Sequence, residues 1–129
     1  TAYTPTWTGS GGNPSIGDGA LAGKYFKVGK IVFFEIGLSW GTTTNAGTGT
    51  WSFGLPSVSV AIEGGSFPGI VVDFATRRYL VFGHQADTTT IQISHEDQAG
   101  GITADVGAAV PHTWANGDTM TVGGRYLEE

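Results

Sequence analysis

The sequence predicts an all-β fold, a single-domain antiparallel β-sandwich over residues 1–129, and three observations carry this prediction. Apolar residues alternate with polar or small ones along much of the chain, which is the period of a strand with one buried face. Glycine is abundant, with 22 residues, which disfavours long helices. Turn residues recur between the alternating segments, so we expect roughly eight strands in a jelly-roll-like arrangement.

The clearest alternation lies within residues 29–56. One face of its first strand is apolar throughout, with Val32, Phe34, Ile36, Leu38 and Trp40. After a polar loop at residues 42–49 the same pattern returns in Trp51, Phe53 and Leu55. Pro56 ends it because proline cannot donate to a strand ladder. We therefore predict two strands joined by a polar loop, with Trp40 and Trp51 in the core.

Shorter alternations predict the other strands. They lie at residues 3–7, 20–28, 58–62 and 70–75, from residue 77 onward, at residues 91–94, and at residues 119–127. Two further stretches are too rich in small and polar residues for regular strands. Residues 9–19 are predicted as a long loop, and residues 97–109 as a loop or a loosely paired edge.

The first long strand has apolar residues on its second face as well. Ile31 and Phe33 lie opposite the main apolar row, so a lone sheet would expose them. A second apolar face indicates another layer, and a symmetric partner supplies one economically. His95 continues the face of Ile91 and Ile93, and we interpret it as a structural or subunit-contact residue. Ile31, Phe33 and His95 are thus the predicted subunit interface.

Composition argues against several function classes. The net charge is −5 with six basic residues, whereas nucleic-acid binding needs a basic footprint. No apolar run approaches the roughly 20 residues of a membrane-spanning helix, so we expect no membrane insertion. The absence of cysteine removes disulfides and cysteine-ligated zinc.

Catalytic and metal-binding chemistry receives little support from the sequence. The carboxylates are scattered, and no nucleophile-elbow or phosphate-loop motif is present. His95, Glu96 and Asp97 could supply metal ligands, joined by His84 and His112. Adjacent strand residues point in opposite directions, however, so a structural histidine or one at a subunit contact is the preferred interpretation. We expect no enzyme activity, no metal and no cofactor.

Glycan binding is a stronger possibility, because exposed aromatic faces on rigid loops can stack against sugar rings. Trp7, Tyr3 and Trp114 lie near predicted turns, and Trp114 is equally compatible with capping the core and with facing a ligand. Thr43 and Asn45 lie in the polar loop, where a scaffold commonly holds binding residues. These five residues are the predicted ligand-binding set. A carbohydrate-binding module or lectin of cellular origin is the main rival function, and a small hydrolase a weaker one.

Several motifs resemble a family of small structural domains found in tailed-phage and prophage virion proteins, minor tail proteins among them. The motifs are Tyr3-Thr4-Pro5-Thr6-Trp7-Thr8, Ile16-Gly17-Asp18-Gly19, Gly23-Lys24-Tyr25, Gly47 to Pro56, Thr113 to Asp118 and Gly124-Arg125-Tyr126. The resemblance implies a homotrimeric β-sandwich knob on the virion surface, in contact with other virion proteins and adhesive toward host-surface glycan. It supplies no catalytic residues.

Two roles fit this resemblance. One is the receptor-binding head of a tail fibre, and the other is a decoration protein docked on the capsid. A virion protein folds in the reducing host cytoplasm and is released by lysis, which agrees with the lack of cysteine and of an export signal. The first predicted strand begins near Thr1, which we take to favour decoration, whereas usage of the family favours the tail.

Overall fold

A computed structural model describes residues 1–60, 66–97 and 102–129, without the side chains of residues 96, 97, 102 and 103. In these ranges the chain forms strands and no helix, which confirms the all-β prediction. Accordingly, no described segment is a helix long and apolar enough to cross a membrane.

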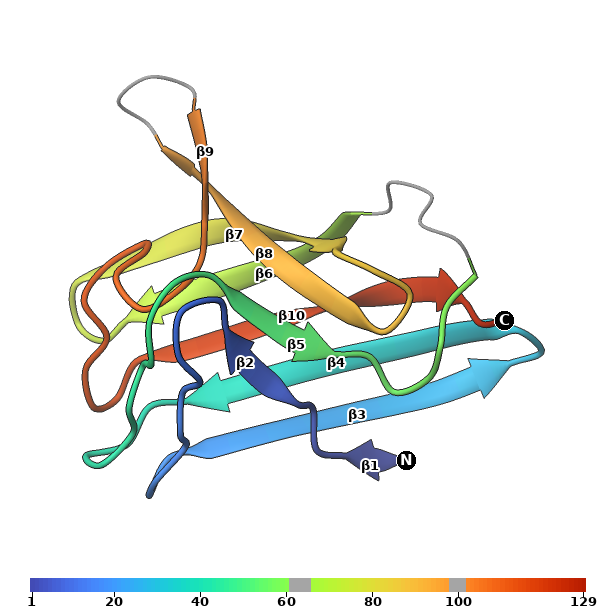
Figure 1. Cartoon of the computed structure of the whole chain (residues 1–129), viewed down its shortest axis with the longest axis horizontal. Helices are drawn as coiled ribbons and strands as arrows, with labels where there is room; N and C mark the ends of the chain where they lie inside the picture. Colours follow the sequence, from blue (N-terminus) through green and yellow to red (C-terminus); the bar gives the residue numbers. More distant parts are fainter. Residues whose placement is uncertain (61–65, 98–101) are drawn as a thin grey trace.

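Within the described ranges, ten strands form one antiparallel sheet (Figure 1). They are β1 (Ala2–Tyr3), β2 (Trp7–Gly9), β3 (Ala20–Val28), β4 (Ile31–Ser39), β5 (Trp51–Gly54), β6 (Ser66–Asp73), β7 (Arg77–Gln85), β8 (Thr90–Asp97), β9 (Ile102–Asp105) and β10 (Thr119–Leu127). Their order is β1-β3-β4-β10-β6-β7-β8-β5-β2, and β9 pairs with β8 outside this path.

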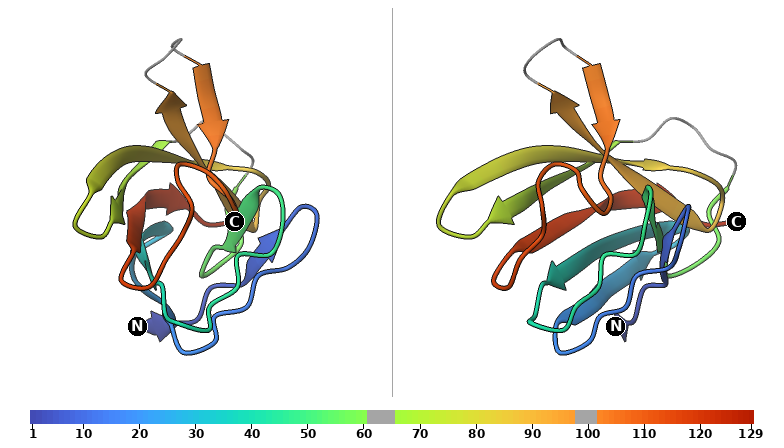
Figure 2. Two further views of the ribbon diagram at one scale, coloured as in Figure 1. Left: turned by 90° about the vertical axis from the view of Figure 1, so that its left-hand side faces the viewer. Right: turned by 60° about the vertical axis from the view of Figure 1, so that its left-hand side comes forward.

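The sheet curls until its two ends face each other (Figure 2). β2, β5 and β8 lie across from β3, β4 and β10, and β6 and β7 join the two layers. The result is a sandwich-like domain, as predicted, whose layers belong to one continuous sheet instead of two separate ones. Antiparallel pairing throughout is consistent with a curled sheet that has one face on a core and one face free.

The core lies between these layers and contains the residues that the alternation predicts. Trp51 is fully buried and Trp40 is 8% exposed, as expected for core positions. The Trp51 ring meets Trp7 edge-on at 4.9 Å, an arrangement that aromatic rings favour, and lies tilted against Trp114 at 5.0 Å. The remaining core is aliphatic and aromatic, from β4, β5, β6, β7, β8 and β10, with Val106 from the segment after β9.

The long strands agree with the sequence, whereas the first predicted strand is two strands. β3 and β10 have the predicted bounds, 20–28 and 119–127. The predicted strand at residues 3–7 divides into β1, which pairs with β3, and β2, which pairs with β5. Because Pro5 has no N–H to donate, the chain leaves the first ladder there and crosses to the opposite layer.

The strand predicted at residues 58–62 is wrong in its described part. Residues 58–60 form only an isolated bridge, between Ser59 and Glu128, and residues 61 and 62 lie outside the described ranges. The phase is also inverted, since Ser59 is 1% exposed and Val58 is 44% exposed. Ser59 is buried because its hydroxyl has partners there: it donates to the Thr88 carbonyl and accepts from Gln85.

The loops at residues 10–19 and 40–50 lie side by side at one end of the domain. Isolated bridges join Gly12 to Thr48 and Ser15 to Asn45. The predicted loop or edge at residues 97–109 contains β9, which pairs only with β8, and these two strands extend beyond the rest of the sheet (Figure 1).

Candidate functional site

The outer face of β3, β4 and β10 carries a group of apolar side chains at one end of the sheet. The register pairs Phe26 with Phe33, and it pairs Ile31 with both Val28 and Leu127. Side chains that are paired across adjacent strands lie on the same face of a sheet. These five residues therefore form one continuous surface, which we name the outer apolar patch.

The outer apolar patch is open to solvent in a single chain. Phe26 is 58% exposed, Val28 60% and Leu127 52%. The rings of Phe26 and Phe33 stack 4.8 Å apart with an interplanar angle of 9°. Ile31 and Leu127 also line a shallow groove with Arg125 and Tyr126. Ile31 and Phe33 thus lie on the free face that the sequence predicts, together with three apolar residues that were not predicted.

Basic residues surround the outer apolar patch. Lys24 faces outward on β3, where it pairs with Glu35, Lys30 lies in the turn after β3, and Arg125 faces outward opposite Phe33 on β10. Lys27 also belongs to β3, but it pairs with the buried Val32 and lies on the other face of the sheet. They are four of the six basic residues in a chain whose net charge is −5. Lys27 forms an ion pair with Glu128. This end of the sheet is therefore more positive than the chain as a whole.

The third residue of the predicted interface, His95, lies on the opposite face of the sheet. It pairs with Val81 in the β7–β8 register, and Val81 is buried in the core. Its ring meets Tyr79 edge-on at 5.3 Å. The structure therefore supports the structural interpretation of His95 and separates it from Ile31 and Phe33.

The structure buries both tryptophans of the predicted ligand-binding set. Trp7 is 9% exposed, and Trp114 is 7% exposed and donates from its indole nitrogen to the Gly107 carbonyl. Tyr3 is half-buried, packs edge-on against Tyr25, and has its pKa raised by burial. Trp114 thus caps the core. Neither tryptophan offers a ring face to a sugar, because both rings are packed in the core. Trp7 lies where the chain crosses between the layers, and Trp114 lies in the segment before β10.

The neighbouring loops at residues 10–19 and 40–50 are joined by bridges, and we name them together the double loop. Thr43 and Asn45 are exposed on it. Asp18 braces this loop, because its Oδ1 accepts hydrogen bonds from the Thr43 N–H at 2.7 Å and the Thr43 hydroxyl at 3.0 Å. Hydrogen bonds from the Thr42 hydroxyl and from Thr43 lower the pKa of Asp18 to about 2. Asn45 exchanges backbone hydrogen bonds with Ser15 at 2.8 and 3.0 Å. The loop tip is therefore held in one conformation by its neighbour.

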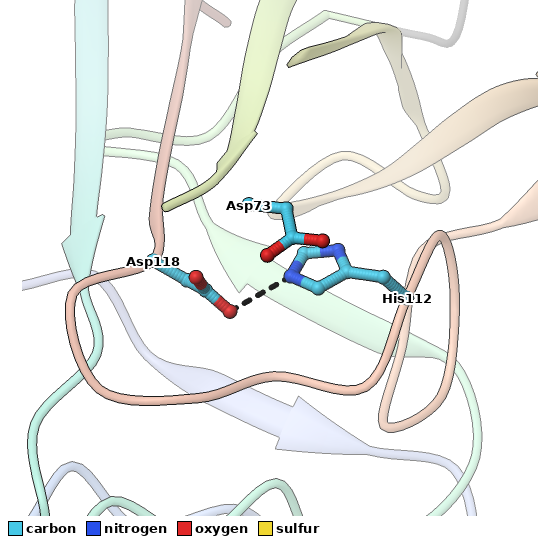
Figure 3. Close-up of side chains that lie close together, drawn as sticks. All are labelled: Asp73, His112 and Asp118. Carbon is cyan, nitrogen blue, oxygen red and sulfur yellow. Dashed lines mark hydrogen bonds and ion pairs between the residues drawn. The ribbon is translucent and has the colours of Figure 1, made fainter. Parts of the chain in front are cut away.

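A third group of polar residues, not predicted as a set, gathers where β6 ends and β10 begins (Figure 3). We name Asp73, His112 and Asp118 the His112 cluster. One potential ligand atom from each lies within 4.8 Å of the other two. His112 Nε2 is 2.8 Å from Asp118 Oδ2, and the two side chains are 8% and 2% exposed. No pattern in the sequence joins these residues, because 39 positions separate Asp73 from His112.

Asp118 is the organising residue of the His112 cluster. Burial raises the pKa of its carboxyl, but hydrogen bonds from the Phe74 N–H, from His112 and from the Ala115 N–H outweigh burial and hold that pKa below its ordinary value. His112 is also sandwiched between rings, with Tyr79 stacked at 5.6 Å and Trp114 at 4.7 Å. The sequence also named Glu96 and Asp97 as possible metal ligands together with His112. The side chains of Glu96 and Asp97 lie outside the described part of the structure, so that grouping stays a prediction.

The comparisons with known proteins identify no relative: the chain matches no protein-family model, no curated protein and no solved structure.

Proposed function

We propose that this protein is a non-catalytic structural subunit of a tailed-phage virion surface, in which three copies assemble through the outer apolar patch into a knob on the tail fibre or the capsid. The observation that carries the proposal is the patch itself, an exposed apolar surface on a second face of an already complete sandwich. The virion location rests on the sequence motifs that resemble phage structural domains.

The size of the apolar side chains makes burial of the patch favourable. Removing a large apolar side chain from water contributes roughly 1.5–3 kcal/mol. Phe26, Val28 and Leu127 each have more than half of their surface to bury, and Ile31 and Phe33 add the rest. Several such residues per copy can exceed the several kcal/mol that association costs. A second copy of the chain is always available as the partner.

The charges around the patch favour a cyclic arrangement over a twofold one. In a twofold contact a surface meets itself, so Lys24, Lys30 and Arg125 of two copies would approach one another. In a head-to-tail ring the patch meets a different surface of the next copy. Since the chain as a whole carries a net charge of −5, that surface can be acidic. The charge pattern around the patch therefore supports a head-to-tail ring. The motif resemblance implies that this ring contains three copies.

Matched surface variants test the proposal. Phe26→Ser combined with Leu127→Ser should convert the oligomer to monomers, because it removes two of the most exposed apolar side chains of the patch. Leu80→Ser is the control, since Leu80 is 72% exposed but lies on β7, outside the patch. Sedimentation velocity at micromolar concentration measures the outcome.

The result that supports the proposal is an oligomer for the wild type and for Leu80→Ser, with monomers for the double variant. If the double variant remains as large as the wild type, the patch is not the interface. Circular dichroism of each variant at the same concentration confirms that the sheet is folded, since all three positions face outward and contribute little to the core.

A second candidate function, adhesion to host-surface glycan, is supported by the braced loop tip alone. Thr43 and Asn45 present polar groups on a loop that is already ordered, which lowers the entropic cost of binding. Asn45→Ala should weaken glycan-array binding at least several-fold, whereas Thr8→Ala, an exposed residue on β2, should not. A signal that is unchanged in Asn45→Ala would remove the loop tip from consideration.

A further inference from the structure

The turn before β10 contains a pair of residues with a chemistry of its own, Asn116 and Gly117. The backbone nitrogen that follows an asparagine can attack the side-chain carbonyl, and a following glycine hinders this attack least because it has no side chain. The other two asparagines of the chain precede proline and alanine. Proline has no N–H, and the alanine methyl hinders the approach. The sequence therefore singles out Asn116, which the structure leaves exposed.

In the folded chain the nitrogen of Gly117 is already engaged. Its N–H donates to the Trp40 carbonyl at 3.1 Å. Gly117 has a φ of 95°, as the third residue of a type II turn requires, and the Asp118 N–H donates back to the Ala115 carbonyl at 3.0 Å. The closed turn therefore holds the attacking nitrogen in a hydrogen bond that the reaction has to break.

Asp118 fastens the same turn to the rest of the domain. Its Oδ2 accepts a hydrogen bond from the Ala115 N–H and its Oδ1 accepts one from the Phe74 N–H, both at 2.8 Å. The Asp118 carbonyl accepts from the Trp40 N–H, also at 2.8 Å. The Phe74 ring covers the turn, since a Cβ built at Gly117 would lie 3.2 Å from it. Opening the turn breaks these contacts together, so open conformations are rare.

We propose that Asn116 is a site of spontaneous deamidation that the fold guards, and that the reaction takes place only while the turn before β10 is open. The Gly117 nitrogen bonds to the side-chain carbonyl carbon of Asn116 and loses its proton, and the side-chain nitrogen leaves as ammonia. Water then opens the cyclic imide at either of its two carbonyls. The product is an aspartate, or an isoaspartate in which the main chain continues through the side-chain carbonyl. Water is the only co-reactant.

The isoaspartate product prevents the turn from closing as before. It adds one carbon to the main chain between residues 116 and 117, so the hydrogen bonds of Gly117 and Asp118 lose their spacing. The modified chain carries an added negative charge, so anion exchange separates it from the unmodified one. Because hydrogen bonds are lost, the melting temperature of the isoaspartate fraction should be lower by about 4 °C. An unchanged melting temperature would contradict this consequence for the turn.

Ageing of the whole chain at mildly alkaline pH tests the site. Trypsin cleaves after Arg78 and Arg125, and the peptide of residues 79–125 contains Asn116 as its only asparagine. Mass spectrometry follows the conversion of its amide to a carboxyl. The conversion should be at least about tenfold slower in the folded chain than in the chain unfolded by urea. Asn45, in the peptide of residues 31–77, is the internal control and should react far more slowly than Asn116 in urea.

Two variants test whether the turn is the guard. Asp118→Ala removes the side-chain acceptor of the Ala115 and Phe74 N–H groups, so the reaction in the folded chain should accelerate at least about tenfold. Phe74→Ser removes the covering ring and should accelerate it several-fold. Phe74 is 66% exposed, so this variant should fold even if circular dichroism shows that Asp118→Ala does not. Leu80→Ser is the matched control, since Leu80 is 72% exposed but lies on β7, and its rate should equal that of the wild type.

Three results would overturn the proposal. If Asn116 does not react in the unfolded chain, it is not a deamidation site. If it reacts equally fast in the folded and the unfolded chain, the fold does not guard it. If Phe74→Ser reacts no faster than Leu80→Ser, the contacts of this turn are not the guard.

Discussion

Ser59 is one of two polar side chains among the described residues that are almost completely buried. The alternation of residues 58–62 predicts the reverse, with Val58 and Val60 inside. The prediction fails because periodicity measures hydrophobicity alone, and the fold contains acceptors and donors that match a hydroxyl at this position. Ser59 donates to the Thr88 carbonyl at 3.2 Å and accepts from the Gln85 amide. Such a match depends on the tertiary fold, so no local pattern reveals it.

Replacing Ser59 should therefore be costly despite the small size of the residue. Ser59→Ala leaves the Gln85 amide without this partner, while the Thr88 carbonyl keeps its hydrogen bond from the Ser59 N–H, and we expect a loss of about 1 kcal/mol in the free energy of unfolding. Urea unfolding measures it. The control is Ser39→Ala on the exposed face of β4, which should change stability by less than about 0.5 kcal/mol. Equal effects at the two positions would contradict this account of Ser59.

The tryptophans show a second limit, at the residue scale, on how well burial can be predicted from the sequence. Trp40 and Trp51 belong to strands with strict alternation, so their burial is predictable. Trp7 and Trp114 lie at a chain crossing and in a loop, where no period indicates a direction. Their burial follows from packing against Trp51, at 4.9 and 5.0 Å, and that contact exists only once the sheet has curled.

At the scale of elements, the strands that the sequence predicts best are those in the longest ladders. β3, β4 and β10 pair along nine residues each, with one face in the core and the other free, and this produces an uninterrupted period of two. Short elements such as β1 and β2 have too few residues for a period. Their separation depends on Pro5 and on which layer each segment joins.

The double loop is an element whose order depends on one carboxylate. The pKa of Asp18 falls from 3.8 to about 2, because its charged form accepts hydrogen bonds from Thr42 and Thr43. A lowered folded-state pKa means that the stabilisation is present above about pH 4 and is lost as the pH falls through 2. We expect the Thr43 amide resonance to shift over that window in an NMR titration.

Asp18→Asn provides the comparison for the double loop. It should abolish that acid-dependent shift and lower stability at neutral pH, because a neutral amide accepts these hydrogen bonds more weakly. Asp87 is the matched control, since hydrogen bonds from Thr89 and Thr90 lower its pKa in a different turn. Asp87→Asn should leave the Thr43 titration intact. A Thr43 amide that titrates identically in Asp18→Asn would contradict the bracing role.

At the scale of the whole molecule, the sequence predicts a contact surface on the second face of the first long strand, but it does not show how far that surface extends. Ile31 and Phe33 were predicted as a contact. Phe26 and Val28 share a phase within residues 20–28, so the signal for them was present, but their proximity to Ile31 and Phe33 requires the β3–β4 register. Leu127 joins them through β10, from the other end of the chain. The His112 cluster also depends on long-range register and was beyond local patterns.

The assembled state is the central claim, because the outer apolar patch is the feature that distinguishes a subunit from a finished monomer. Light scattering coupled to size-exclusion chromatography tests it most directly, at micromolar concentration and near-physiological salt. The account predicts one species with three times the 13.4 kDa mass of a single chain. A stable monomer under those conditions would contradict it.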